Sequence, residues 1–91
     1  MREQQLQKKI IDWLESQGFW TVKVITTNKR GCPDILACHK GRFIAIEVKA
    51  EGKLNTVTPI QEFQINQILT ADGIAIAADS LETVKKVLDN V

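Results

Sequence analysis

Hydrophobic residues recur along the chain at spacings that change from helical to alternating. Between residues 6 and 17 they fall at every third or fourth position, which predicts an amphipathic helix that ends at Gly18. Residues 19–26 alternate and are rich in β-branched and aromatic side chains, so they predict a strand. Two more apolar stretches, 34–39 and 42–50, flank Lys40 and Gly41, a pair that is typical of a two-residue hairpin turn.

The second half of the chain predicts a further helix, strand and helix. Thr58 as N-cap, Pro59 at the first helical position and Gln61 in a capping box begin a helix that runs to about residue 71. A strand at 74–78 follows, and Ser80 caps the last helix. The expected order is α-β-β-β-α-β-α, with strands 42–50 and 74–78 parallel and joined by a crossover. Because strand 42–50 is apolar on both faces, we expect an α/β fold with a mixed sheet flanked by helices.

Length and charge restrict the functional classes. The 91 residues predict one domain over 1–91 with a thin core, so a deep pocket would require a second subunit. The net charge of +1 hides an uneven distribution, because residues 1–53 carry +4 and residues 54–91 carry −3. Such asymmetry indicates either a face that meets an anion or uneven scatter over a solvated surface. The longest uncharged apolar run, residues 73–78, cannot span a bilayer, and residues 1–5 contain no signal core. A cytoplasmic protein is expected.

The cysteines and tryptophans predict packing rather than chemistry. Cys32, Cys38 and His39 are too few and too close in sequence for a structural zinc site, so we expect reduced thiols in the core. Trp13 and Trp20 each fall on the apolar side of their element and are also expected in the core.

The hairpin brings two carboxylates together. With a two-residue turn at 40–41, Asp34 lies opposite Glu47, and cross-strand Cβ atoms are about 5 Å apart. Lys49 lies two residues further on and points to the same face. Pro33 cannot donate to a ladder and therefore belongs at the start of its strand. Because opposed like charges are destabilising, the pattern indicates a divalent cation between the carboxylates.

Other polar residues permit both a structural and a functional reading. Glu3 precedes the apolar stripe of its helix by three residues and can join the carboxylates, although acidic residues also favour first helical turns. Gln61 faces inward, but its capping box also explains it. The basic residues Lys29, Arg30 and Lys53 are candidate DNA phosphate contacts or solvated loop charges.

One combination of residues resembles a known family. Gly31-x-Pro33-Asp34, followed after twelve residues by Glu47-x-Lys49, is similar to the PD-(D/E)xK nuclease signature, and more narrowly to small stand-alone VRR-NUC proteins of phages and bacteria. The resemblance covers nearly the whole chain and implies a restriction-endonuclease-like fold. The approach to the second helix, at 55–58, is slightly longer than we expect for that family. The resemblance implies Mg²⁺ or Mn²⁺ held by Glu3, Asp34, Glu47 and the carbonyl of Val48, with Lys49 and Gln61 beside it.

The resulting functional hypothesis is a metal-dependent endonuclease that hydrolyses phosphodiester bonds in branched DNA such as Holliday junctions or flaps. A homodimer is implied, and neither an organic cofactor nor a membrane partner is expected. The alternatives are a restriction-like or nicking nuclease and a non-catalytic DNA-binding or scaffold module on the same fold.

Overall fold

The computed structural model describes residues 1–91 and confirms the predicted order of elements. One short 3₁₀ helix, η1, lies inside the loop that was expected before the second long helix. The bounds are α1 Glu3–Ser16, β1 Trp20–Lys23, β2 Ile35–His39, β3 Arg42–Val48, η1 Leu54–Thr56, α2 Pro59–Thr70, β4 Ile74–Ala78 and α3 Leu81–Val87.

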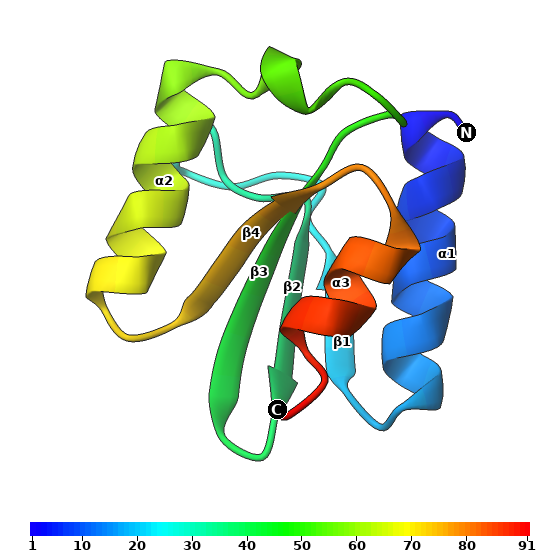
Figure 1. Cartoon of the computed structure of the whole chain (residues 1–91). Helices are drawn as coiled ribbons and strands as arrows, with labels where there is room; N and C mark the ends of the chain where they lie inside the picture. Colours follow the sequence, from blue (N-terminus) through cyan, green and yellow to red (C-terminus); the bar gives the residue numbers. More distant parts are fainter.

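The four strands form one mixed sheet in the order β1-β2-β3-β4. The first three strands are antiparallel, whereas β3 and β4 are parallel and α2 makes the connection between them. Figure 1 shows α1 and α3 beside each other and α2 separate from both of them. Contacts place α1 against β1 to β3, and α2 against β3 and β4.

The core lies between the sheet and the two helices α1 and α3. Alternation along β3 directs Ile44, Ile46 and Val48 into it, where they meet the stripe of α1 that contains Ile10 and Leu14. All five of these side chains are fully buried. Helix α1 ends as predicted, because Gly18 follows it with a φ of +86° and provides the left-handed turn.

The opposite face of the sheet is only partly covered. Small side chains at Ala45 and Ala75 are buried beneath α2, which itself has no fully buried residue. Beyond α2 the face is open, so Trp20 is 66% exposed and Phe43 is 44% exposed. The apolar pattern of β3 had predicted that helices cover both faces along its whole length. In the structure, one face of β3 is covered only in part.

Two packing predictions are wrong for the same reason. Trp20 and Cys38 are paired neighbours on β1 and β2 and lie on the open face, so neither belongs to the core. Cys32 is half-buried, and Trp13 packs against the edge of the core. Alternation identifies the two faces of a strand, but it does not tell which face a helix will cover.

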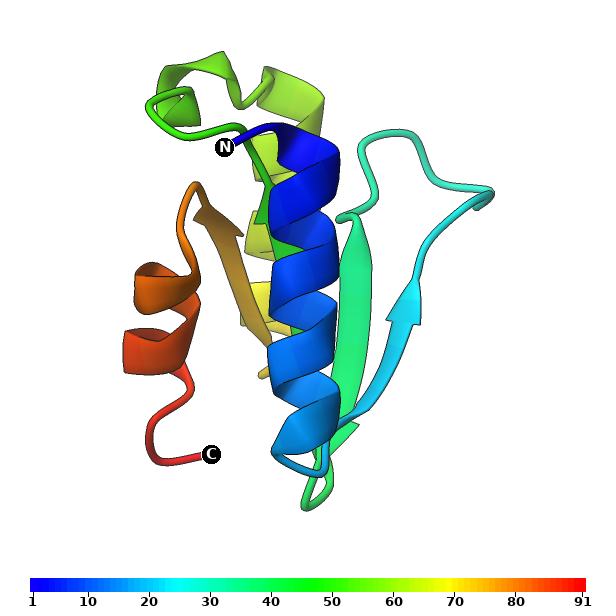
Figure 2. The same ribbon diagram turned by 90° about the vertical axis from the view of Figure 1, so that its right-hand side faces the viewer.

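Some elements are shorter than their hydrophobic patterns. β1 ends at Lys23, after which only the Val24 N–H continues the pairing by donating to the Asp34 carbonyl at 2.8 Å. Figure 2 shows the connection from β1 to β2 projecting away from the sheet. Helix α3 ends at Val87, although apolar residues at helical spacing continue to Val91. None of the three helices has both the length and the apolar character that crossing a membrane requires.

Candidate active site

The hairpin has the predicted register. Lys40 and Gly41 both have positive φ, +51° and +78°, as a tight two-residue turn requires. His39 pairs with Arg42 and Ile35 with Ile46, so the next positions, Asp34 and Glu47, face each other at the end of the ladder. The Val48 N–H donates to Oδ2 of Asp34 at 2.8 Å, which fixes this carboxylate against the end of β3.

The first helix brings a third carboxylate to the same place. Glu3 opens α1, and its exposed side chain reaches the end of the sheet where β3 finishes. One carboxylate oxygen from each of Glu3, Asp34 and Glu47 lies within 4.8 Å of the other two. Residues from the first helix and from the hairpin therefore form one acidic cluster, which is the arrangement that one of the two interpretations of Glu3 requires.

Glu47 is the most perturbed group of the cluster. Its side chain is almost wholly buried, and its pKa is raised from 4.5 to about 8. Burial is the largest cause. The negative charge of Asp34, a hydrogen bond that protonated Glu47 can donate to Asp34, and the charge of Glu3 also raise this pKa, whereas the charge of Lys49 lowers it. Oε1 of Glu47 is buried and has no hydrogen-bond partner. Three carboxylates in this arrangement favour a proton or a metal cation.

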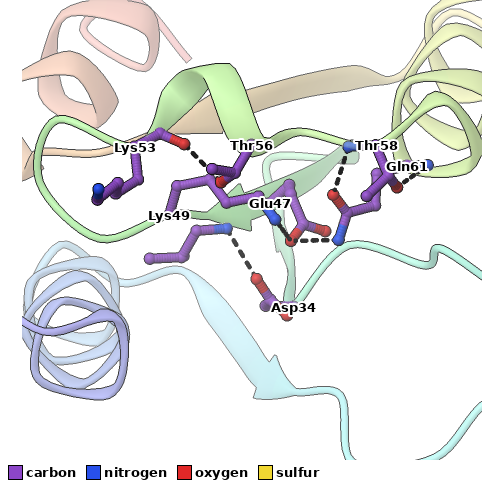
Figure 3. A network of polar contacts seen from close by, with 8 residues as sticks. Asp34, Glu47, Lys49, Lys53, Thr56, Thr58 and Gln61 are labelled. Carbon is purple, nitrogen blue, oxygen red and sulfur yellow. Dashed lines mark hydrogen bonds and ion pairs between the residues drawn. The ribbon is translucent and has the colours of Figure 1, made fainter.

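Two other predicted site residues contact Glu47 from different sides. Lys49 Nζ lies 3.8 Å from Glu47 Oε2, and Gln61 Nε2 donates to the same oxygen at 3.2 Å. Figure 3 shows both side chains converging on this carboxylate. Lys49 is itself largely buried, so its ammonium group is held close to the cluster.

Gln61 makes the capping-box contacts and also contacts Glu47. Its backbone N–H donates to Thr58 Oγ1 at 3.3 Å, and its Oε1 accepts from the Thr58 N–H at 3.0 Å, which completes the capping box. The remaining amide group, Nε2, contacts Glu47. The cap therefore holds the Gln61 amide in the orientation that reaches the carboxylate.

The three basic candidates lie outside this contact network. Lys29 and Arg30 are exposed in the connection between β1 and β2, and Lys53 is exposed before η1. Figure 3 shows the Lys53 side chain directed away from the acidic residues.

The loop before β2 is held against α2 by contacts that sequence reasoning did not identify. Gln64 Nε2 donates to the Arg30 carbonyl at 3.0 Å. Gly31 has a φ of +76°, and a Cβ atom there would lie only 2.8 Å from the Ile60 carbonyl oxygen. The only available signal for Gln64 was its spacing of three residues from Gln61, which places both on one helix face.

Comparison with known proteins identifies the same fold elsewhere. Residues 2–86 match a family model described as archaeal Holliday junction resolvase. A solved structure named VRR_NUC domain is 21% identical, with a TM-score of 0.82, and the alignment covers 97% of this chain and 95% of the other. A second, named VRR_NUC domain protein, is 21% identical with a TM-score of 0.81, covering 98% and 86%. No curated protein sequence matches the chain.

Proposed function

The chain belongs to the archaeal Holliday junction resolvase family of PD-(D/E)xK nucleases, and from this premise we propose that it is a metal-dependent endonuclease of branched DNA. The VRR-NUC resemblance found in the sequence is confirmed by this match, with two structures that share the fold. The observation that carries the proposal is the cluster of three carboxylates, with Lys49 beside it. The proposed reaction is hydrolysis of phosphodiester bonds in Holliday junctions or flaps.

The residues of the cluster fit Mg²⁺ or Mn²⁺. Both ions bind oxygen ligands, and carboxylates are among the ligands that they prefer. One oxygen from each of the three carboxylates lies within 4.8 Å of the other two, so the three side chains surround a space that one ion can share. The unpartnered Oε1 of Glu47 also needs a cation or a donor.

The backbone carbonyl of Val48 is a further proposed ligand. Its N–H donates to Asp34, and the Lys49 N–H points the other way, to the Ala78 carbonyl. Because the N–H and C=O of one strand residue point to the same side, the Val48 carbonyl faces Asp34. The residue opposite Val48 is Pro33, which has no N–H to donate.

Each side chain has a separate proposed role. When bound, the ion polarises the scissile phosphate and lowers the pKa of the attacking water. Glu3, Asp34 and Glu47 hold the ion, and Lys49 orients the water or stabilises charge that develops on the phosphate. Gln61 positions Glu47 through the contact at 3.2 Å. Lys29, Arg30 and Lys53 are proposed to contact DNA phosphates outside the cluster.

The open apolar face supports a homodimer. Phe63 of α2 is 52% exposed, and it lines a groove of about 550 Å³ together with Leu36, Phe43 and Ile68. Trp20 extends the apolar surface along the sheet. We propose that a second copy covers this face, because contiguous exposed apolar patches mark interaction surfaces. Sedimentation equilibrium at micromolar concentration tests this: a monomer would contradict it, and Phe63→Lys should convert a dimer to a monomer.

A cleavage assay tests the enzymatic proposal. Wild type, Glu47→Ala and Lys49→Met are incubated with Mn²⁺ and with a four-way junction, a flap or linear duplex of equal length. Wild type should cut the branched substrates, and the cleavage rate of both variants should be at least about 100-fold lower. As a control, Asp89→Asn changes an exposed residue after α3 and should cut at the wild-type rate. Equal cleavage by Glu47→Ala would refute the site. Binding without cleavage would favour the scaffold alternative, and preference for linear duplex would favour the restriction-like one.

A further inference from the structure

Only two buried side-chain nitrogen or oxygen atoms of the chain lack a hydrogen-bond partner, and one of them lies outside the acidic cluster. They are Glu47 Oε1 and Gln7 Oε1. Gln7 is 8% exposed and lies on the buried side of α1, although glutamine is among the residues that are mostly exposed. A buried acceptor without a donor destabilises the folded state, because it loses its hydrogen bonds to water. Gln7 therefore requires an explanation that packing does not supply.

The position of Gln7 on its helix relates it to the acidic cluster. It follows Glu3 by four residues, so both lie on one face of α1, one turn apart. Side chains of an α-helix tend to lean toward its N-terminus, which favours placement of the Gln7 amide over the turn that carries Glu3. The Glu3 carboxylate lies within 4.8 Å of those of Asp34 and Glu47.

No donor of the protein lies within hydrogen-bonding distance of this oxygen. The flanking positions of the same helix face are Leu6 and Ile10, both apolar and buried. A hydrated divalent cation supplies what is missing, because Mg²⁺ keeps several of its waters when protein carboxylates bind it, and each such water donates hydrogen bonds.

We propose that Gln7 is a positioning residue of the metal site, whose Oε1 accepts a hydrogen bond from a water bound to the ion held by Glu3, Asp34 and Glu47. The inference rests on the proposed function, because it requires the ion. Gln7 then fixes the orientation of a metal-bound water without touching the metal.

The test compares Mn²⁺ affinity with stability in the absence of metal. Gln7→Met keeps the length of the side chain and removes the acceptor, and Gln4→Met changes an exposed residue of the same helix as the control. By titration calorimetry we expect Gln7→Met to bind Mn²⁺ about tenfold more weakly, and Gln4→Met to match wild type. In EDTA, Gln7→Met should melt at or above the wild-type temperature, because an unpaired polar atom has been removed.

A purely structural role predicts a different pattern. It would lower the melting temperature in EDTA and leave the Mn²⁺ dissociation constant within twofold of wild type, and this result would overturn the proposal. Gln7→Glu restores an acceptor oxygen and should recover Mn²⁺ binding, and failure of that rescue would count against the inference. If Gln7→Met does not fold, Gln7→Leu, which matches its apolar neighbours, takes its place. Absence of Mn²⁺ binding by wild type would refute the proposed function itself, whereas equal binding by wild type and variant refutes only the role of Gln7.

Discussion

Replacing Glu47 with glutamine should remove metal-dependent activity and stabilise the metal-free protein. Folding raises the pKa of Glu47 from 4.5 to about 8, so the folded state binds a proton that the unfolded state releases between these values. The free energy of unfolding of metal-free wild type therefore falls as pH rises from about 4.5 to about 8. Glutamine keeps the shape and accepts from Gln61 and Lys49, but it does not titrate.

The size of the effect follows from the same shift. A pH of 7 lies 2.5 units above 4.5, the pKa of this carboxyl in the unfolded chain. One pKa unit corresponds to about 1.4 kcal/mol. Glu47→Gln should thus exceed wild type by about 3 kcal/mol at pH 7 and by less than about 1 kcal/mol at pH 5. For a chain of this length the difference at pH 7 corresponds to roughly 12 to 24 °C in melting temperature.

Urea and thermal unfolding in EDTA at pH 5, 6, 7 and 8 measure this difference. Glu15→Gln, at an exposed position of α1, serves as the control and should follow wild type at every pH. Mn²⁺ at about 1,000 times its dissociation constant should reverse the order, because it adds about 4 kcal/mol to wild type alone. The reasoning is refuted if Glu47→Gln is no more stable than wild type at pH 7, or if the difference does not grow with pH.

Three further predictions concern metal binding, α2 and the loop before β2. Mn²⁺ binding at pH 7 should release close to one proton from Glu47. The measured binding enthalpy should therefore depend on the ionisation enthalpy of the buffer, and a binding enthalpy that is the same in every buffer would contradict this. Gln61→Ala and Thr58→Ala should each lower the free energy of unfolding by about 1 kcal/mol, because each removes part of the helix cap. Only Gln61→Ala also removes the contact with Glu47, so it alone should slow cleavage, by about tenfold or more. If the two variants cleave at the same rate, the role of Gln61 is limited to capping. Gly31→Ala should lower the free energy of unfolding by about 2 kcal/mol more than Gly52→Ala does. Both glycines have positive φ, but only at Gly31 would the added Cβ meet a backbone oxygen. Equal urea midpoints for the two variants would refute that contact.

The sequence was sufficient for those parts of the site that depend on local structure. The length of the turn at 40–41 sets the hairpin register, and that register places Asp34 opposite Glu47 without any knowledge of the rest of the fold. The helical position of Glu3 likewise follows from a spacing of three and seven residues to the apolar stripe of its helix. These relations are set by the periods of strand and helix, which the residue types reveal directly.

The tertiary structure decided what depends on coverage and approach. Alternation along β1 and β2 defined two faces, but only the placement of α2 over β3 and β4 left Trp20 and Cys38 exposed instead of buried. The same placement brought the capped Gln61 to Glu47. The raised pKa of Glu47 arises from burial and from the charges of Asp34 and Glu3, which are distant in the sequence, and the unpartnered Gln7 is visible only once its surroundings are known. Local periodicity fixes where a side chain points, whereas long-range packing fixes what it meets there, and the acidic cluster of this chain depends on both.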